Sequence, residues 1–336
     1  MKASLVQPVY TCIIKTNKAA YNVSNVITGL TLSQNEEEMA QSVSVTIPNL
    51  KDSYKYLYNN ISVRDSLYLY CNTGGENHEI FRGTIWDKDY SSDVTKDLTL
   101  TAYDRLIYLQ NTKDNFFFSK GKSTESIIKS ICKRWGVKVN FRYQSIKHKR
   151  MILREETVAD SILQVLDEVK KKTGKKYVIS CEKGVLVIRK RGYNSTVYSV
   201  NYKENALSQN TRVTMDGMIT KVAIYREQES ESSQEKPPKK VTVVKGNTKK
   251  YGTLQEIIIR DSEDKKSTQA KKEAKEILKE YGKPFYDRTV EAVDNPYIKK
   301  GHKIKSNAGA LEGYYIVKGI EHDCMNGIMS LEVETS

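Results

Sequence analysis

Residues 9 to about 112 alternate between apolar and polar positions in short runs that end at turn residues. The runs are Val9–Lys15, Val43–Ile47, Ser66–Tyr70, Ile80–Trp86 and Leu98–Tyr103. A period of two places successive side chains on opposite faces of a strand, so each run predicts a strand with one buried face. Several short strands at this spacing are typical of a small barrel or sandwich. We therefore predict a first β domain over residues 1–115.

From residue 116 the apolar period becomes helical. Ser123 or Thr124 can cap a helix that Gly136 ends, and its apolar positions are Ile127, Ile128, Ile131, Cys132 and Trp135. A second helix is predicted from Thr157 to about Thr173, with an apolar face of Val158, Ile162, Val165, Leu166 and Val169. Short strands are predicted at Val137–Phe141, Tyr177–Ser180 and Val185–Ile188. Residues 116–200 are thus predicted to form a small α+β module.

The last part of the chain returns to strand patterns. A strand-like run over 211–225 is followed by a charged, Ser-rich stretch that predicts a mobile loop over about 226–250. A helix is predicted over about 265–281, with Tyr281 on its apolar face. Strands follow at Tyr314–Met325 and Ile328–Val333, and Asn326-Gly327 between them signals a two-residue type I′ hairpin. We predict a second β domain over residues 201–336.

The first and last parts echo one another. The segments Val63–Leu67, Phe81–Ile85 and Leu98–Thr101 find counterparts, in the same order, in Ile298–Ile304, Ile316–Ile320 and Met329–Val333. Two unrelated antiparallel domains can look this alike, but the chain could also hold two copies of one β-barrel. The predicted fold class is therefore α+β, mainly β, with two barrel domains and an α+β module between them.

The positive charge of the chain is concentrated in one segment. Residues 116–200 hold 20 Lys/Arg against 7 Asp/Glu, a net of +13 out of +14 for the whole chain. Such a segment attracts polyanions, so a polyanion-binding or nucleic-acid-binding protein is an alternative function. Few aromatic residues are interleaved with the charges, and we expect an acidic protein surface or plain solvation rather than nucleic acid. The candidate contact residues are Lys170, Lys171, Lys172, Lys175 and Lys176.

No residue pattern nominates a catalytic or metal site. The five cysteines lie far apart and predict buried free thiols, and the four histidines are read as surface or turn residues. Glu36, Glu37 and Glu38 are read as part of a solvated loop. We expect no enzyme activity, no cofactor, no signal peptide and no membrane insertion. The 22 tyrosines, against 6 phenylalanines, favour strands with one solvent-exposed face and assembly interfaces.

Four segments carry a resemblance to a known family. Gly29–Ser33, Val43–Asn49, Phe81–Trp86 and Leu98–Leu109 resemble the opening of the XkdQ-type hub proteins of contractile phage tails and phage-tail-like bacteriocins. The order of the later segments, to Gly313–Ile320, is similar as well.

The resemblance implies a structural role. It implies two tube-protein-like barrels per chain and a homotrimer whose six barrels form a ring between a six-fold tail tube protein and a three-fold central spike protein. Tape-measure and baseplate wedge proteins are further expected partners. The protein would assemble in the bacterial cytoplasm and end in the baseplate. Some hubs carry a fused peptidoglycan hydrolase, and we expect none here because the chain ends at Ser336, directly after a hairpin.

Overall fold

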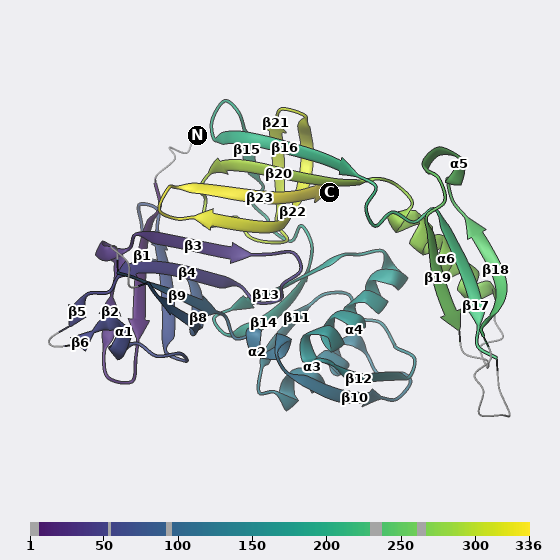
Figure 1. Cartoon of the computed structure of the whole chain (residues 1–336), viewed down its shortest axis with the longest axis horizontal. Coiled ribbons are helices and arrows are strands. Elements are labelled where there is room, and N and C mark those ends of the chain that lie inside the picture. Colours follow the sequence, from purple (N-terminus) through teal and green to yellow (C-terminus); the bar gives the residue numbers. More distant parts are fainter. Residues whose placement is uncertain (1–6, 53–54, 92–95, 229–236, 261–266) are drawn as a thin grey trace. The chain divides into compact units, whose positions relative to one another are not determined.

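The computed structural model describes residues 7–52, 55–91, 96–228, 237–260 and 267–336. Its contacts divide the chain into two compact units, one of Met1–Gln209 with Thr289–Ser336 and one of Asn210–Arg288. Half of the chain is strand and 18% is helix, so the fold is α+β and mainly β, as predicted. The larger unit holds three modules, which Figure 1 colours from purple to teal and in yellow.

The first β module is an antiparallel sheet in the order β2-β1-β7-β8-β9-β4-β3. Its strands are β1 (Val9–Lys15), β2 (Ala20–Asn22), β3 (Gly29–Gln34), β4 (Ser42–Pro48), β7 (Ser66–Asn72), β8 (His78–Tyr90) and β9 (Asp97–Tyr103). The short elements η1 (Ser24–Val26), β5 (Lys51–Asp52), β6 (Lys55–Tyr56) and α1 (Leu57–Asn60) connect them. Alternate residues of β4, namely Val43, Val45 and Ile47, are fully buried. The alternation in the sequence therefore corresponds to one core-facing side of each strand.

The α+β module packs two helices against two small sheets. Its elements are α2 (Ile107–Gln110), β10 (Lys113–Phe118), α3 (Thr124–Arg134), β11 (Lys138–Arg142), β12 (Met151–Thr157), α4 (Val158–Thr173), β13 (Tyr177–Glu182) and β14 (Val185–Lys190). The hydroxyls of Ser123 and Thr157 cap α3 and α4, and Gly174 ends α4 with φ of 69°. The five predicted apolar residues of α4 are all fully buried. Both helices lie where the sequence predicts them.

The second β module holds β15 (Tyr198–Asn201), β16 (Ala206–Thr214), β20 (Phe285–Val293), β21 (Lys303–Ala308), β22 (Leu311–Asp323) and β23 (Ile328–Thr335). Its core includes Val290, Ile304, Val317 and Leu331, all at most 1% exposed.

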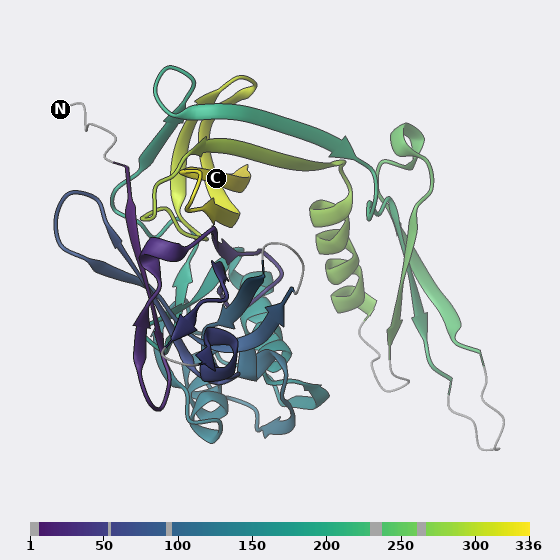
Figure 2. The ribbon, with the colours of Figure 1, turned by 60° about the vertical axis from the view of Figure 1, so that its left-hand side comes forward.

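Residues 210–288, which include the C-terminal part of β16 and the N-terminal part of β20, form a unit of their own, a division that the sequence pattern did not predict. It contains β17 (Lys221–Arg226), β18 (Lys239–Lys245), α5 (Thr248–Tyr251), β19 (Gln255–Arg260) and α6 (Ser267–Tyr281). Ala270 and Ala274 of α6 pack on Val222 and Ile224 of the β18-β17-β19 sheet, and Figure 2 shows α6 along that sheet.

The predicted loop over 226–250 is wrong for its described part. Val241, Val243 and Val244 are β-branched, and β18 pairs along β17 from Lys239 to Lys245. Residues 229–236 of that prediction lie outside the described residues.

Three local predictions also need correction. Trp135 and Tyr281, predicted on apolar helix faces, are 39% and 38% exposed, because Trp135 is the C-cap residue that follows α3 and Tyr281 is the last residue of α6. The Asn326-Gly327 turn is not a two-residue hairpin. Asp323 pairs with Ile328, and its carboxylate accepts hydrogen bonds from the backbone and side chain of Asn326, which favours a four-residue turn.

Three of the four histidines are not at the surface. His148, His302 and His322 are buried, at 3%, 8% and 2% exposure, and each ring has a hydrogen-bond partner. The absence of metal-ligand spacing in the sequence excluded a ligand role but could not distinguish a buried, hydrogen-bonded imidazole from an exposed one.

Candidate assembly interface

The two β modules have the same strand order. The first reads β1-β7-β8-β9-β4-β3 and the second β15-β21-β22-β23-β20-β16. If the six strands of each module are ranked along the chain, both orders become 1-4-5-6-3-2. One difference is that β15 runs parallel to β21, whereas β1 runs antiparallel to β7. The repeat that the sequence left open is therefore present in the structure.

The central strands of the two modules share an irregularity. β8 is bulged at Trp86, just past Ile85, and β22 is bulged at Lys318, just past Val317. A bulge bends its strand and is placed by the fold rather than by chance. The coincidence makes Ile85 and Val317 equivalent positions.

A turn repeats with the strands. The N–H of Arg64 donates to the carbonyl of Ile85 at 2.8 Å, and the N–H of Gly301 donates to the carbonyl of Val317 at 2.8 Å. Arg64 and Gly301 both have positive φ, 75° and 84°. The same turn, in the same conformation, thus precedes β7 and β21.

The two modules meet at one strand pair. β3 runs antiparallel to the end of β22, with Thr31 opposite Asp323, and Figure 1 shows these strands side by side. On the exposed face of the pair, the hydroxyl of Ser33 donates to the carboxylate of Glu321 at 3.3 Å. The sheet therefore continues from one copy of the module into the other.

A buried polar cluster lies behind this junction. Asp294 accepts a hydrogen bond from Tyr10 of the first module and lies 2.6 Å from Nδ1 of His322. Burial, followed by the neighbouring thiol of Cys324 and the Asp294 carboxylate, raises the pKa of Tyr10 well above its usual range. The phenol therefore stays protonated and donates. Buried groups of this kind, once mutually satisfied, fix how two modules dock.

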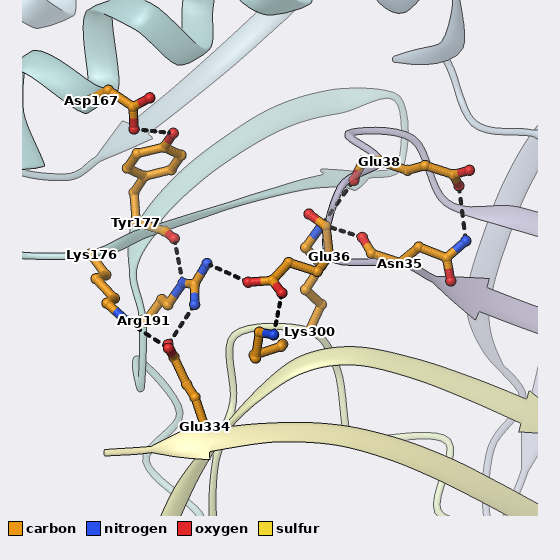
Figure 3. Close-up of polar contacts among 10 residues, drawn as sticks. Asn35, Glu36, Glu38, Asp167, Lys176, Tyr177, Arg191, Lys300 and Glu334 are labelled. Carbon is orange, nitrogen blue, oxygen red and sulfur yellow. Dashed lines mark hydrogen bonds and ion pairs between the residues drawn. The ribbon is translucent and has the colours of Figure 1, made fainter. Parts of the chain in front are cut away.

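An ion-pair network joins all three modules of the larger unit (Figure 3). Arg191 donates to the carbonyl of Tyr177 at 2.9 Å, and its Nη1 lies 2.5 Å from Oε1 of Glu334 in the second β module. The same guanidinium lies 3.6 Å from Glu36 of the first β module. Burial alone would raise the pKa of Glu334, but the hydrogen bond from Lys176 and the charge of Arg191 outweigh it and lower that pKa.

Lys300 ties the second β module to the β3–β4 loop. Its Nζ donates to the carbonyl oxygens of Asn35, Glu36 and Glu38, at 2.5, 3.0 and 2.8 Å. Burial and then the charge of Arg191 lower the pKa of Lys300 to about 8. The reading of Glu36 as part of a solvated loop is therefore wrong, because its carboxylate also pairs with Lys318 at 2.5 Å. Sequence reasoning missed this network, whose members are far apart in the chain.

Each of the five predicted lysines has an interaction partner within the chain. Lys176 pairs with Glu334 at 2.5 Å, Lys171 lies 3.6 Å from Glu168, and Lys175 donates to Gln144 at 2.8 Å. Lys172 donates to the carbonyl of Lys147 at 3.4 Å, and Lys170 also has an interaction partner. The structure places them at the end of α4 and in the segment leading to β13.

A groove of about 740 Å³ separates the first β module from the α+β module. Basic and aromatic side chains line it, among them Arg82, Arg105, Lys138, Lys183, Tyr108 and Trp135.

The described residues contain no group of three or more His, Cys, Asp or Glu able to hold a metal ion. The five cysteines are free thiols, as predicted, but only four of them are buried and Cys181 is partly exposed. Burial raises the pKa of Cys12, Cys71 and Cys132 to about 12, which keeps these thiols protonated and unreactive. Within the part of the chain that the structure describes, no helix has the length and apolar character needed to cross a membrane.

Two curated proteins of Bacillus subtilis (strain 168) are similar to this chain. The uncharacterized protein YqbQ is 24% identical over 229 residues, which is 66% of this chain and 66% of YqbQ. The phage-like element PBSX protein XkdQ is 26% identical over 180 residues, 53% of this chain and 52% of XkdQ. The aligned part thus spans about two thirds of one relative and about half of the other. The resemblance to XkdQ-type proteins is confirmed.

Solved structures share the fold over nearly the whole chain. The 43 kDa tail protein of prophage MuSo2 from Shewanella oneidensis has a TM-score of 0.68 at 15% identity, covering 97% of this chain and 98% of that one. A tail protein from Neisseria meningitidis MC58 has a TM-score of 0.67 at 14% identity, covering 96% of each chain. An E. coli type VI secretion component, described as similar to the T4 tail proteins gp27 and gp5, has a TM-score of 0.53 at 9% identity, covering 92% and 74%. These likenesses concern the fold, whereas the family model described as YQBQ-like matches residues 30–334, and the chain therefore belongs to the YQBQ-like family.

Proposed function

We propose that this chain is a structural, non-enzymatic protein of a phage tail baseplate. The tail proteins that share its fold, and its relative XkdQ from a phage-like element, support this role. The polar clusters of the larger unit are consistent with it, because Arg191, Lys300 and Asp294 each join modules to one another. These contacts hold the three modules of the larger unit together.

Within the baseplate, we propose the hub position of a contractile tail or tail-like particle. The observation that carries this proposal is the duplicated β module, since one chain then presents two similar faces. Three such chains supply six similar modules, which suits a ring that meets a six-fold tail tube on one side and a three-fold central spike on the other. Tape-measure and wedge proteins are further proposed partners. Assembly in the bacterial cytoplasm would precede incorporation into the baseplate.

The mass of the purified chain tests this function. Light scattering over a range of protein concentrations, with and without the central spike protein of the same particle, should give three chains per complex. A chain that stays monomeric at every concentration and ignores the spike would contradict the hub.

The rival function is polyanion binding through the basic α+β module. The basic groove lined by Arg82, Arg105, Lys138 and Lys183 is the observation that favours it. This function requires retention on DNA or heparin that falls steeply with salt. If the chain is monomeric and is retained in this way, polyanion binding becomes the better-supported function and the hub function is contradicted.

A further inference from the structure

We infer that the strand junction inside the chain is repeated between chains, with β16 of one copy pairing with the end of β8 of the next. The inference rests on the proposed trimer and names the edges that build it. Its basis is a difference between the outer strands of the two copies: β3 has strand neighbours on both sides, β4 and β22, whereas among the described residues β16 ends the sheet beside β20.

The β8 edge is the counterpart of the β22 edge that β3 occupies. β7 pairs with β8 only as far as Thr84, and in the described residues the stretch Asp87–Tyr90 has its strand neighbour on the β9 side. In β22, the corresponding stretch past the bulge pairs with β23 on one side and β3 on the other. A half-paired strand end is a template for another strand.

The helix α1 does not prevent such pairing. Lys88 donates to the carbonyl oxygens of Tyr58 and Ile61, at 2.9 and 3.0 Å, so the α1 segment lies close to this end of β8. Its counterpart in the second module is the segment that ends at Ile298, which is as fully buried as Ile61. That segment coexists with β3 on β22.

The equivalences identify one pair of side chains. Counting from the bulges makes Asp89 the counterpart of Glu321, and both carry a carboxylate. On β16, cross-strand contacts place Arg212 beside Asp287 at 3.8 Å and Ser208 beside Glu291 at 2.7 Å. The β20–β23 pairing ends at Thr289, and extending its register by two residues gives Asp287 the strand position that Ser42 has in the first module, where Ser42 faces Ser33. Arg212 is therefore the counterpart of Ser33.

The contact of Ser33 with Glu321 inside the chain thus becomes a contact of Arg212 with Asp89 between chains. The two charges are opposite, which favours this occupant of the edge. Arg212 is 64% exposed, so its present contacts with Asp216 and Asp287 are weak surface pairs that can be exchanged. β16 also exposes Leu207 and Val213 to 52% and 55%, apolar area that a neighbouring strand can cover.

We assign the partner strand to a second copy of this chain, because the two edges that would pair, those of β16 and β8, are different edges of the same chain. A contact between two different edges of identical chains is heterologous, and it gives a closed ring when the rotation between neighbours closes and an open filament when it does not. Internal and external junctions alternate along such an assembly. A rotation of one sixth of a full turn at each junction closes a ring after six modules, which are the three chains of the proposed trimer.

Charge exchange tests the pair. Asp89→Arg alone and Arg212→Asp alone should each raise the concentration at which half the chains are trimeric by about tenfold, and the double variant should restore it. Lys15→Asp, a charge reversal at an exposed residue of β1, is the matched control and should leave the trimer unchanged.

Thiol cross-linking gives a second readout that does not depend on affinity. In a Cys181→Ser background, Asp89→Cys combined with Arg212→Cys should react with a short bis-maleimide to give a covalent ladder that stops at three chains. Either cysteine alone should give no ladder. A trimer that is unaffected by both charge reversals and gives no cross-linked ladder would contradict the pairing of β8 with β16 but not the hub function. A chain that is monomeric under all conditions would contradict both the pairing and the hub function.

Discussion

Arg64 and Gly301 occupy the same place in two copies of one turn, yet only the second has the residue that its backbone favours. Both have φ between 70° and 90°, a region that costs an L-residue free energy and glycine almost none. Arg64 is exposed and Gly301 is buried. Glycine should therefore be the more stable residue at both positions, so that introducing it at position 64 and removing it at position 301 have opposite effects on stability.

Arg64→Gly should raise the free energy of unfolding by roughly 0.5–1 kcal/mol, since relief of the backbone strain exceeds the entropy that glycine adds to the unfolded chain. Gly301→Ala should lower it by about 2–3 kcal/mol, because a Cβ there would stand 2.7 Å from both methyls of Val178. Denaturant unfolding measures both changes. Val178→Ala in the Gly301→Ala background should recover part of the loss, and no recovery would mean that the close contact is not its cause.

The duplication shows what a single sequence can reveal about this fold. The echo of Val63–Leu67 in the segment ending at Ile304 marked the turn and the strand that repeat, because turn chemistry and strand alternation are local. Helix α4 could be predicted in the same way, because the residues that begin and end it, Thr157 and Gly174, directly flank it in the sequence.

Arg191 should be hard to replace even by lysine. Its guanidinium bridges the carbonyl of Tyr177, Glu334 and Glu36, and a single ammonium cannot reach all three. We expect Arg191→Lys to cost about 1–3 kcal/mol of stability. Thermal unfolding checks this, with Arg212→Lys on the exposed surface as the control. Equal stability of the two variants would show that the network adds nothing to module docking.

His302 should make folding sensitive to acid. Burial, followed by the charges of Lys299 and Arg189, lowers its pKa to about 4 from an ordinary value near 6.5. Between these values the unfolded chain binds the extra proton, so stability rises with pH across that window and is fully present above pH 6.5. The full rise is about 3 kcal/mol.

The contribution of His302 to the pH dependence of stability is measured as a difference between two variants, because other groups also titrate in that pH window. Asp104, for example, has its pKa raised by burial to about 7, which acts with the opposite sign. Wild type minus His302→Gln should gain stability as pH rises from 4 to 6.5. A flat difference would mean that the ring is protonated or solvated in the folded state.

The ion-pair network and the unit of residues 210–288 could not be read from the sequence. Glu36 and Lys318 lie in different modules, so no local pattern relates them, and only the docking of the β modules brings them to 2.5 Å. The strand β18 follows a charged stretch. The composition of that stretch favoured a loop, although β18 itself contains three valines. Local chemistry predicts elements, whereas long-range pairing decides which polar residues become buried partners.

The lysines at the end of α4 should separate into two classes. Lys171, Lys172 and Lys175 are exposed and lie on weak surface contacts, whereas Lys176 pairs with the partly buried carboxylate of Glu334. The triple change of the first three to Gln should alter stability by less than about 0.5 kcal/mol, and Lys176→Gln alone should cost about 1 kcal/mol.

If the face meets an acidic partner or a polyanion, the triple variant should elute from heparin at lower salt, and Lys176→Gln should elute close to wild type. Unchanged elution of the triple variant would remove this face as a contact surface and leave the groove lined by Arg105 and Lys138 as the remaining basic candidate.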